Sequence, residues 1–287
     1  LVDATLGGAG HARRLLSERP DLRLLGLDRD LEALGAARSV LAPFGDRVVT
    51  RHSRFDLLQT VMADLALDQV SGVLFDLGVS SPQLDEQERG FSYRQDGPLD
   101  MRMDTTARVT AFDVVNGYAE ADLARILADY GDERFARRIA ASIVCARPIG
   151  TTGQLAEVVR SAIPAATRRR GGHPAKRTFQ AIRIEVNQEL AVLPVAIDQA
   201  LAATAPRGRV AVLSYHSGED RIVKERFRRA VTGGCTCPPG LPCVCGAERT
   251  VRIVRPEKRT PGTAEIERNR RAASAILRVV ERIEVVS

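Results

Sequence analysis

The sequence predicts an α/β fold in which a helical subdomain interrupts a parallel sheet. Residues 1–76 alternate short apolar runs with helical patterns, helical patterns alone follow after Met103, and an apolar run returns at Gly208–Tyr215. Strands that alternate with helices form parallel sheets, because each helix carries the chain back across the sheet. We therefore place the sheet domain in residues 1–104 and 185–287, with a helical domain inserted at 105–184.

The chain opens on a strand end, a glycine-rich turn and the start of a helix. An apolar start leads into Asp3, the turn Gly7–Gly10 follows, and Ala12–Leu16 has the pattern of first helical turns. This order sets a ligand against bare backbone at a helix N-terminus. A Cβ on these glycines would block both positive φ angles and the approach of that ligand. Because Leu1 already lies within a strand-like run, we expect further residues to precede it in the full protein.

The turn favours S-adenosylmethionine over a dinucleotide as the ligand. Gly8 and Gly10 match a dinucleotide fingerprint, but Arg13 stands where its third glycine belongs. Asp3 would repel a pyrophosphate, whereas it suits a ligand with a cationic centre and an amino acid tail. Asp28 ends the second apolar run, where such folds hydrogen-bond a ribose. A purely structural turn is the alternative.

The remaining elements follow from hydrophobic periodicity. In the first part we expect strands at Leu24–Asp28, Val48–Thr50 and Val70–Asp76, and helices at Leu31–Leu41 and Phe55–Ala66. Helical stripes then run through Leu123–Tyr130, Phe135–Ile143, Leu155–Ala162 and Phe179–Leu193. After Gly208–Tyr215, later strands are expected at Thr250–Val254 and Ala275–Arg282.

The composition indicates a globular protein with a polyanionic partner. Of 287 residues 44% are hydrophobic, and 42 Lys and Arg against 36 Asp and Glu give a net charge of +6. Such a balance fits RNA or DNA, although an arginine-rich proteome would produce it too. The sequence contains neither an apolar run of membrane-spanning length nor a signal peptide, so we expect a cytoplasmic protein without a membrane partner.

Four of the five cysteines are crowded into one short segment. Cys235, Cys237, Cys243 and Cys245 do not resemble a secreted disulfide framework. Four thiols could satisfy tetrahedral zinc, but the C-x-C spacing is less typical than C-x2-C. A reduced, proline-rich hairpin is the alternative, and we assign no metal site from the sequence. Cys145 falls on a helical stripe and is expected in the core.

Several motifs in sequence order resemble those of the RsmH (MraW) methyltransferases, which act on cytidine N4 in small-subunit ribosomal RNA. The matching blocks are Asp3–His11, Asp28–Asp30, Asp76–Leu84, Arg89–Ser92, Asp96–Met103, Tyr130–Phe135, His173–Arg183 and Ser214–Lys224. The resemblance implies a Rossmann-like class I methyltransferase sheet with an inserted helical subdomain. It also implies S-adenosyl-L-methionine as the cofactor, and 16S ribosomal RNA within the small ribosomal subunit, at the decoding centre, as the substrate.

The resemblance also implies a set of site residues. Ala9, Gly10 and His11 would contact the cofactor in the first turn, and Asp28 would take the ribose hydroxyls. Phe55 would pack near the adenine, for which plain core packing is the alternative. Asp76 and Gln83 would complete the cofactor site.

Methylating a cytosine amine requires acceptors for its N–H groups, because the nitrogen lone pair is delocalised into the ring. Asp76 and the backbone carbonyls of residues 77–81 are the acceptors we expect, although Asp76 could be a cofactor ligand alone. His216 follows a strand end at the same edge and would contact RNA or serve as an acceptor, with a histidine that satisfies loop backbone as the alternative.

The expected RNA surface is a basic segment, with a charged but merely solvated loop as the alternative. It comprises Arg168, Arg169, Arg170, His173, Lys176 and Arg177, and a weaker candidate comprises Arg268, Arg270 and Arg271.

The residues favour an S-adenosylmethionine-dependent RNA methyltransferase, and the resemblance implies that it acts on cytosine N4 of ribosomal RNA. One alternative is a non-catalytic RNA-binding factor for ribosome assembly on a methyltransferase fold. A second is a DNA amino-methyltransferase, which would share the cofactor site.

Overall fold

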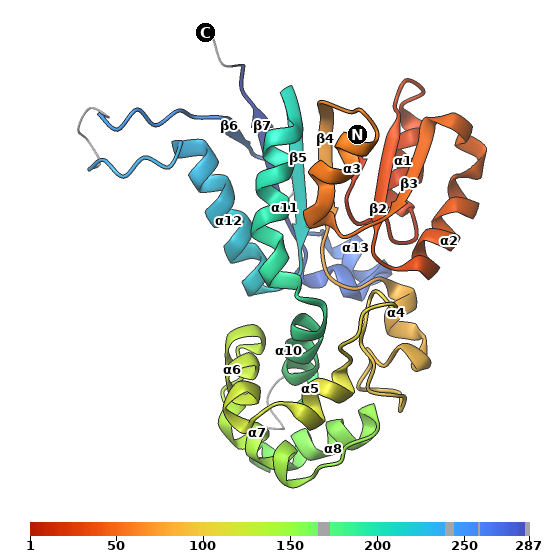
Figure 1. Ribbon diagram of the computed structural model, residues 1–287, viewed down its shortest axis with the longest axis vertical. Helices are drawn as coiled ribbons and strands as arrows, with labels where there is room; N and C mark the ends of the chain where they lie inside the picture. Colours follow the sequence, from red (N-terminus) through yellow and green to blue (C-terminus); the bar gives the residue numbers. More distant parts are fainter. Residues whose placement is uncertain (166–172, 239–243, 258, 285–287) are drawn as a thin grey trace. The chain divides into compact units, whose positions relative to one another are not determined.

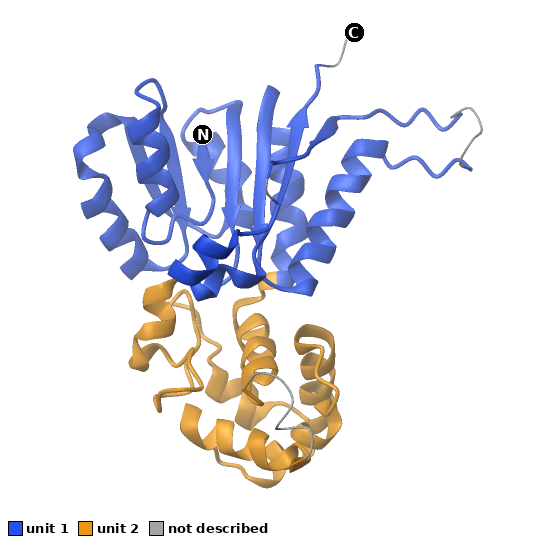
Figure 2. Cartoon of the chain, turned by 180° about the vertical axis from the view of Figure 1, so that it is seen from behind, with its two compact units in different colours: residues 1–78, 190–287 blue, residues 79–189 orange. Residues whose placement is uncertain are grey.

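A computed structural model describes residues 1–165, 173–238, 244–257 and 259–284. The chain divides into two compact units, unit 1 at residues 1–78 and 190–287 and unit 2 at residues 79–189 (Figure 2). Along the described parts of the chain, no helix combines the length and apolar character needed to cross a bilayer.

Unit 1 is built on a seven-stranded sheet of order β3-β2-β1-β4-β5-β7-β6 (Figure 1). The first five strands in this order pair in parallel, whereas β7 is antiparallel to both β5 and β6. The strands are β1 (Val2–Asp3), β2 (Leu24–Asp28), β3 (Val48–His52), β4 (Val70–Asp76), β5 (Thr204–Ser214), β6 (Val251–Val254) and β7 (Ile276–Arg282). This order confirms the predicted α/β fold with a Rossmann-like sheet.

Helices connect the strands of unit 1. They are α1 (Gly10–Glu18), α2 (Leu31–Leu41), α3 (Leu58–Asp64), α11 (Glu189–Ala203), α12 (Ser217–Thr232) and α13 (Thr263–Arg268), with short 3-10 turns η1 (Ala42–Arg47), η2 (Phe55–Leu57) and η4 (Arg270–Ser274). The predictions for β2, α2 and β4 agree with the structure residue for residue. Strands β2 and β4 are nearly continuous apolar runs, as expected for strands that are covered on both faces of the sheet.

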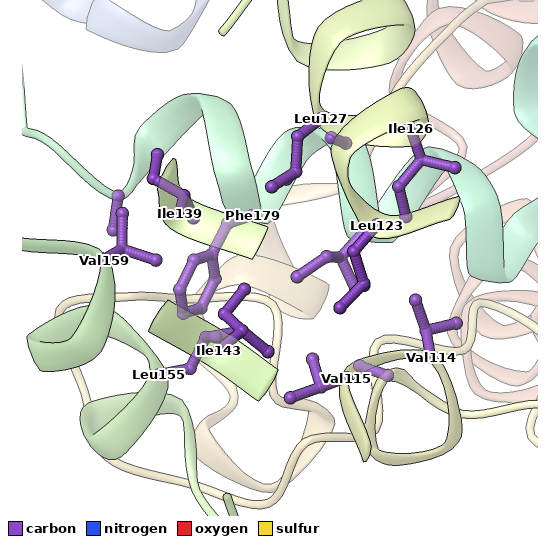
Figure 3. Packing of buried hydrophobic residues seen from close by; sticks show 14 of the residues in the cluster. Val114, Val115, Leu123, Ile126, Leu127, Ile139, Ile143, Leu155, Val159 and Phe179 are labelled. Atoms are coloured by element: carbon purple, nitrogen blue, oxygen red, sulfur yellow. The ribbon is translucent and has the colours of Figure 1, made fainter. Parts of the chain in front are cut away.

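Unit 2 is helical. Its elements are α4 (Ser81–Asp85), η3 (Gln87–Arg89), α5 (Ala111–Gly117), α6 (Glu120–Gly131), α7 (Ala136–Cys145), α8 (Thr152–Ala162) and α10 (Lys176–Asn187). Apolar stripes from these helices point toward one another in a shared core, in which Leu123, Ile139 and Phe179 are almost fully buried (Figure 3). The apolar stripes that were predicted from i, i+3 and i+4 spacing therefore form this core.

The helical unit begins earlier in the chain than the sequence-based boundary at residue 105. Leu99, Met101 and Met103 are buried in its core, although the sequence places them with the sheet domain. The buried amide of Asn187 on α10 fixes this loop, because its Nδ2 donates to the Met101 carbonyl at 2.7 Å and its Oδ1 accepts from the Met103 amide at 2.8 Å. The loop that contains Met101 and Met103 shows no helical or strand periodicity. It nevertheless belongs to unit 2, because its backbone satisfies the buried Asn187 side chain.

Cys145 is exposed, so its predicted place in the core is wrong. The buried side of α7 is formed by Ala136, Ile139, Ala140 and Ile143. Cys145 follows Ile143 by two residues, about 200° further round the helix, and therefore points away from that stripe.

Candidate active site

Three aspartates end three neighbouring strands at the carboxyl edge of the sheet. Asp3, Asp28 and Asp76 are the last residues of β1, β2 and β4, and β1 pairs with both of the other strands. The strand order reverses direction at β1, and open α/β sheets bind ligands outside the strand ends at such a switch point. The candidate site therefore lies where these carboxylates gather.

The turn after β1 leaves backbone open to a ligand. Gly7 and Ala9 have positive φ angles of 49° and 59°, and the Ala9 amide donates to the Leu6 carbonyl at 2.8 Å. A Cβ built on Gly8 or Gly10 would meet no atom within 4 Å. A positive φ angle therefore explains the requirement for glycine at Gly7 alone among these glycines. At Gly8 and Gly10 the missing side chain instead leaves space beside the start of α1, whose first amides have no partner within the helix.

Asp28 is held with its carboxylate against the same turn. Its Oδ2 accepts a hydrogen bond from the Gly7 amide at 2.7 Å, and its Oδ1 accepts from the Asp30 amide at 2.9 Å. Burial raises the pKa of the Asp28 carboxyl, against the opposing effect of these backbone hydrogen bonds. An ionised carboxylate has about four acceptor positions, and backbone amides of Gly7, Arg29 and Asp30 use three of them, so this group can still receive a ribose hydroxyl.

Asp3 is 2% exposed, which is unusual for an acid. Burial raises the pKa of Asp3 to about 7, and the Asp76 carboxylate adds to the rise, whereas a hydrogen bond from the Thr5 amide and the nearby His11 oppose it. The Thr5 amide donates to the Asp3 carboxylate at 3.2 Å. A buried acid in this state gains much from a positive charge placed beside it.

Two side chains contact the Asp76 carboxylate. Tyr215 donates its hydroxyl to Oδ1 at 2.7 Å, and His11 Nε2 lies 3.3 Å from Oδ2. The Asp76 amide donates to the Thr5 hydroxyl at 2.6 Å. The hydrogen bond between His11 and Asp76 is the main cause of a raised pKa of His11, and burial opposes this rise. The carboxylate remains 30% exposed, so it is both fixed and accessible.

Sequence reasoning missed Tyr215 and chose its neighbour His216. The His216 side chain is only 10% exposed and lies 3.2 Å from the buried Glu219, so it does not form an open RNA contact. Glu219 also accepts from the backbone amides of Tyr215 and His216, at 2.7 and 3.3 Å. A usable signal existed, because Tyr215 ends the predicted strand Gly208–Tyr215, whose carboxyl end was expected at the same sheet edge as Asp76.

The structure gives Phe55 and Gln83 local packing and capping contacts of their own. Phe55 starts η2 and packs edge-on against Phe75 of β4, with ring centroids 5.8 Å apart, which fits the core-packing alternative. Gln83 belongs to unit 2, where it is buried and closes a capping box at the start of α4 through Ser80.

The described part of the predicted RNA surface lies at the start of α10. Lys176 and Arg177 are exposed, and the exposed His173 stacks on Tyr93 with ring centroids 4.3 Å apart. Arg168, Arg169 and Arg170 lie outside the described residues. In the weaker candidate, Arg268, Arg270 and Arg271 are also exposed.

Among the cysteines, Cys235, Cys237 and Cys245 lie together, with their Sγ atoms within 4.8 Å of one another. Cys243, the fourth thiol of the pattern, lies outside the described residues.

Comparison with known proteins decides the family. The family model described as the MraW methylase family matches residues 1–283. The chain belongs to this family. The proteins named ribosomal RNA small subunit methyltransferase H from Mycobacterium sp. (strain KMS) and Thermobifida fusca are 54% and 53% identical to it, over 99% and 98% of this chain and 76% and 86% of theirs. A third, from Paenibacillus sp. (strain JDR-2), is 50% identical over 98% of this chain and 92% of its own.

Family membership confirms the resemblance found in the sequence and identifies the chain as a methyltransferase. Solved structures with similar chains include an rRNA methylase from Streptococcus thermophilus, at 11% identity and a TM-score of 0.42 over 99% of this chain and 86% of that one. Another is a methyltransferase homolog protein from Pyrococcus horikoshii, at 10% identity and a TM-score of 0.41 over 98% of this chain and 61% of that one.

Proposed function

We propose that the protein transfers a methyl group from S-adenosylmethionine to N4 of a cytidine in 16S ribosomal RNA of the small subunit. The observation that carries this proposal is the fixed, accessible Asp76 at the end of β4 in a chain of the MraW methylase family. The names of the relatives supply the small-subunit RNA as substrate.

The residues around β1 and β2 fit the cofactor. Asp28 has acceptor capacity left for a ribose hydroxyl, and Gly8 and Gly10 leave the backbone bare where a methionine tail would meet the amides of Gly10 and His11. Asp3 places a buried carboxyl near His11 and Asp76, where it would face a cationic sulfur. Phe55 packs against Phe75 of β4, so we leave it as a core residue. Gln83 closes a capping box in unit 2, and we assign it no cofactor contact.

When bound, the cofactor supplies an electrophilic methyl group on a positively charged sulfonium. The protein must then present an amine whose lone pair is poorly available. Asp76 accepts a hydrogen bond from one N–H of N4, which turns the lone pair toward the methyl group. Asp76 would take up the proton that N4 loses as the new N–C bond forms and the S–C bond breaks, which would leave neutral S-adenosylhomocysteine. Tyr215 and His11 hold the carboxylate in place, so that little reorganisation is needed in the transition state.

The substrate is expected in the bacterial cytoplasm, where small ribosomal subunits reside. The net charge of +6 suits an RNA substrate, and the exposed Lys176 and Arg177 provide cations for its phosphates. A non-catalytic assembly factor is disfavoured, because such a factor would have no need for Asp3, Asp28 and Asp76 to be held together at one sheet edge.

The test measures cofactor binding and methyl transfer separately in two variants. Asp28→Ala is expected to lose binding of labelled S-adenosylmethionine. Asp76→Ala should keep most of that binding but lose transfer by at least about a hundredfold, because it removes the acceptor for the amine. Transfer is assayed on small subunits, on naked 16S ribosomal RNA and on duplex DNA.

Nucleoside mass spectrometry of the product identifies the methylated atom. N4-methylated cytidine formed on small subunits or their RNA supports the proposal. Preferential methylation of duplex DNA would overturn it in favour of a DNA amino-methyltransferase, and the absence of transfer to every substrate by wild-type protein that binds the cofactor would favour an assembly factor.

A further inference from the structure

The structure contains a second cluster of reactive side chains, separate from the three aspartates. It lies in the excursion between α12 and β6, where two extended arms run side by side away from the sheet (Figure 1). Cys235 and Cys237 belong to the first arm, and Cys245 to the second. We propose that these three thiols bind a zinc ion that ties the two arms together.

The distances suit zinc. All three Sγ atoms lie within 4.8 Å of one another. In a tetrahedral site with zinc–sulfur bonds of about 2.3 Å, the sulfur atoms stand about 3.8 Å apart. The sulfur atoms therefore need to approach one another by about 1 Å or less to form such a site. Three soft thiolate ligands select zinc over magnesium or calcium, which prefer oxygen.

The two arms are joined at the base of the excursion. Gly233 caps α12 with a φ of 64°, and a Cβ there would lie 2.4 Å from the Glu248 carbonyl oxygen. The Thr250 amide donates to the Ala230 carbonyl at 3.1 Å, which joins the end of the second arm to α12. These contacts bring the two arms together just before Cys235 and just after Cys245.

The described residues of the arms have little apolar burial of their own. Val244, beside Cys245, is 89% exposed, and Thr236, Pro238 and Glu248 are exposed as well. A segment without a core needs a covalent or metal crosslink to hold one conformation. A zinc site supplies such a crosslink in a reducing compartment, where a disulfide would not persist.

Binding requires thiolates, so three protons leave the cysteines as the zinc–sulfur bonds form. The local charge favours this step. The Arg229 guanidinium lies 3.9 Å from the Cβ position of Gly234, next to Cys235, and Arg249 follows the second arm. Positive charge stabilises a thiolate and offsets the net negative charge of zinc with three of them. The proposal rests on these three described thiols alone.

The experiment measures metal in the full chain purified under reducing conditions without added chelator. Elemental analysis should find about one zinc per chain in the wild type. Cys235→Ser and Cys245→Ser should reduce the zinc content to near zero. Cys145→Ser is the matched control, because Cys145 is exposed at the end of α7, far from this segment in sequence, and this variant should keep its zinc. Replacement of zinc by cobalt should add the intense near-ultraviolet band of thiolate-to-cobalt charge transfer.

The wild-type measurements decide the question even if a serine variant fails to fold. Wild-type protein that takes up neither zinc nor cobalt, or whose Cys235, Cys237 and Cys245 are found by mass spectrometry to be paired in disulfides after reducing purification, would overturn the proposal. Equal zinc content in Cys145→Ser, Cys235→Ser and Cys245→Ser would overturn it too.

Discussion

At the scale of single residues, Asp76 is the group on which the other site contacts converge. Its two carboxylate oxygens face Tyr215 and His11, and its amide is bound to Thr5. Burial, together with the adjacent Asp76, raises the pKa of the Tyr215 hydroxyl above its usual range, so this hydroxyl stays protonated and acts as a donor. Tyr215 is therefore a positioning residue for the carboxylate that we propose as acceptor.

Tyr215→Phe removes one hydroxyl and leaves the aromatic ring in place. A hydrogen bond to a charged group contributes about 1.5–3 kcal/mol. If that free energy positions Asp76 in the transition state, kcat falls about tenfold to a hundredfold with little change in cofactor Kd. Tyr118→Phe is the matched control, because Tyr118 donates to the Glu185 carboxylate at 2.9 Å in unit 2. Equal losses of kcat in both variants would show that Tyr215 has no special role.

Asp3 makes the stability of the protein depend on pH. Burial raises the pKa of its carboxyl from 3.8, the ordinary value for an exposed aspartate, to about 7 in the folded chain. Its contribution to stability is therefore complete below pH 3.8 and is lost as pH rises toward 7, because the unfolded chain releases the proton first. Asp3→Asn should stabilise the protein at pH 8 by up to about 4 kcal/mol and have little effect near pH 4.

Urea unfolding of both proteins at pH 4 and pH 8 measures this difference. The cationic cofactor should also bind the wild type more tightly as pH rises through 7, whereas its neutral-sulfur product S-adenosylhomocysteine should show a weaker trend. A stability change in Asp3→Asn that is the same at both pH values would contradict the burial of an uncharged carboxyl.

The acids at strand ends were predictable from the sequence, whereas their partners were not. Asp28 and Asp76 each close an apolar run that can be identified without a structure. The contact between Tyr215 and Asp76 joins residues 139 positions apart. It depends on β5 pairing with β4 after the whole helical unit has intervened, and no local pattern encodes that pairing.

At the scale of elements, the periodic patterns predicted where helices lie better than where they end. The stripe Phe179–Leu193 spans two helices, because Gln188 adopts a left-handed φ of 54° between α10 and α11. Gln188 carries no turn signal such as glycine, so the break is set by tertiary structure. The helix α12 was not predicted, since Ser217–Thr232 is dominated by charge and only Glu219, Val223 and Phe227 are buried.

The close approach of α6 and α10 leads to a prediction at the scale of elements. Gly131 ends α6, and a Cβ there would lie 2.7 Å from the Arg177 carbonyl oxygen of α10. Gly131→Ala must push the helices apart and should destabilise the protein by about 1–3 kcal/mol. Gly117→Ala is the matched control at the end of α5, where a Cβ meets no atom within 4 Å.

Chemical denaturation of both variants separates the steric effect of a Cβ between α6 and α10 from the general effect of replacing glycine by alanine in a helix. Gly117→Ala should be neutral or stabilising by up to about 1 kcal/mol, because alanine loses less conformational entropy in a helix. If Gly131→Ala were equally neutral, the contact between α6 and α10 would not be close-packed.

At the scale of the whole molecule, each unit has its own hydrophobic core. The buried cluster of unit 2 includes Phe91 and Met103, and those of unit 1 include Phe75 and Leu16. The sequence predicted an inserted helical domain from the loss of strand patterns, yet it could not assign the loops that follow β4. Their side chains join the helical core through contacts such as that of Asn187 with Met101, which composition does not reveal.

The net charge of +6 leads to a prediction for binding of the whole protein to RNA. Each cation that neutralises a phosphate releases counterions. The logarithm of the binding constant therefore falls linearly with the logarithm of the salt concentration, and the slope reflects the number of phosphate contacts. Lys176→Ala removes an exposed cation at the start of α10 and should weaken binding of 16S ribosomal RNA while reducing the slope by about 0.7–1. Arg38→Ala removes an exposed cation from α2 and serves as the control. Filter binding measures these affinities between about 50 and 200 mM salt, where such slopes are large. The slopes then distinguish the Lys176→Ala variant from the Arg38→Ala variant. If both variants changed the slope equally, net charge rather than a surface at α10 would attract the RNA.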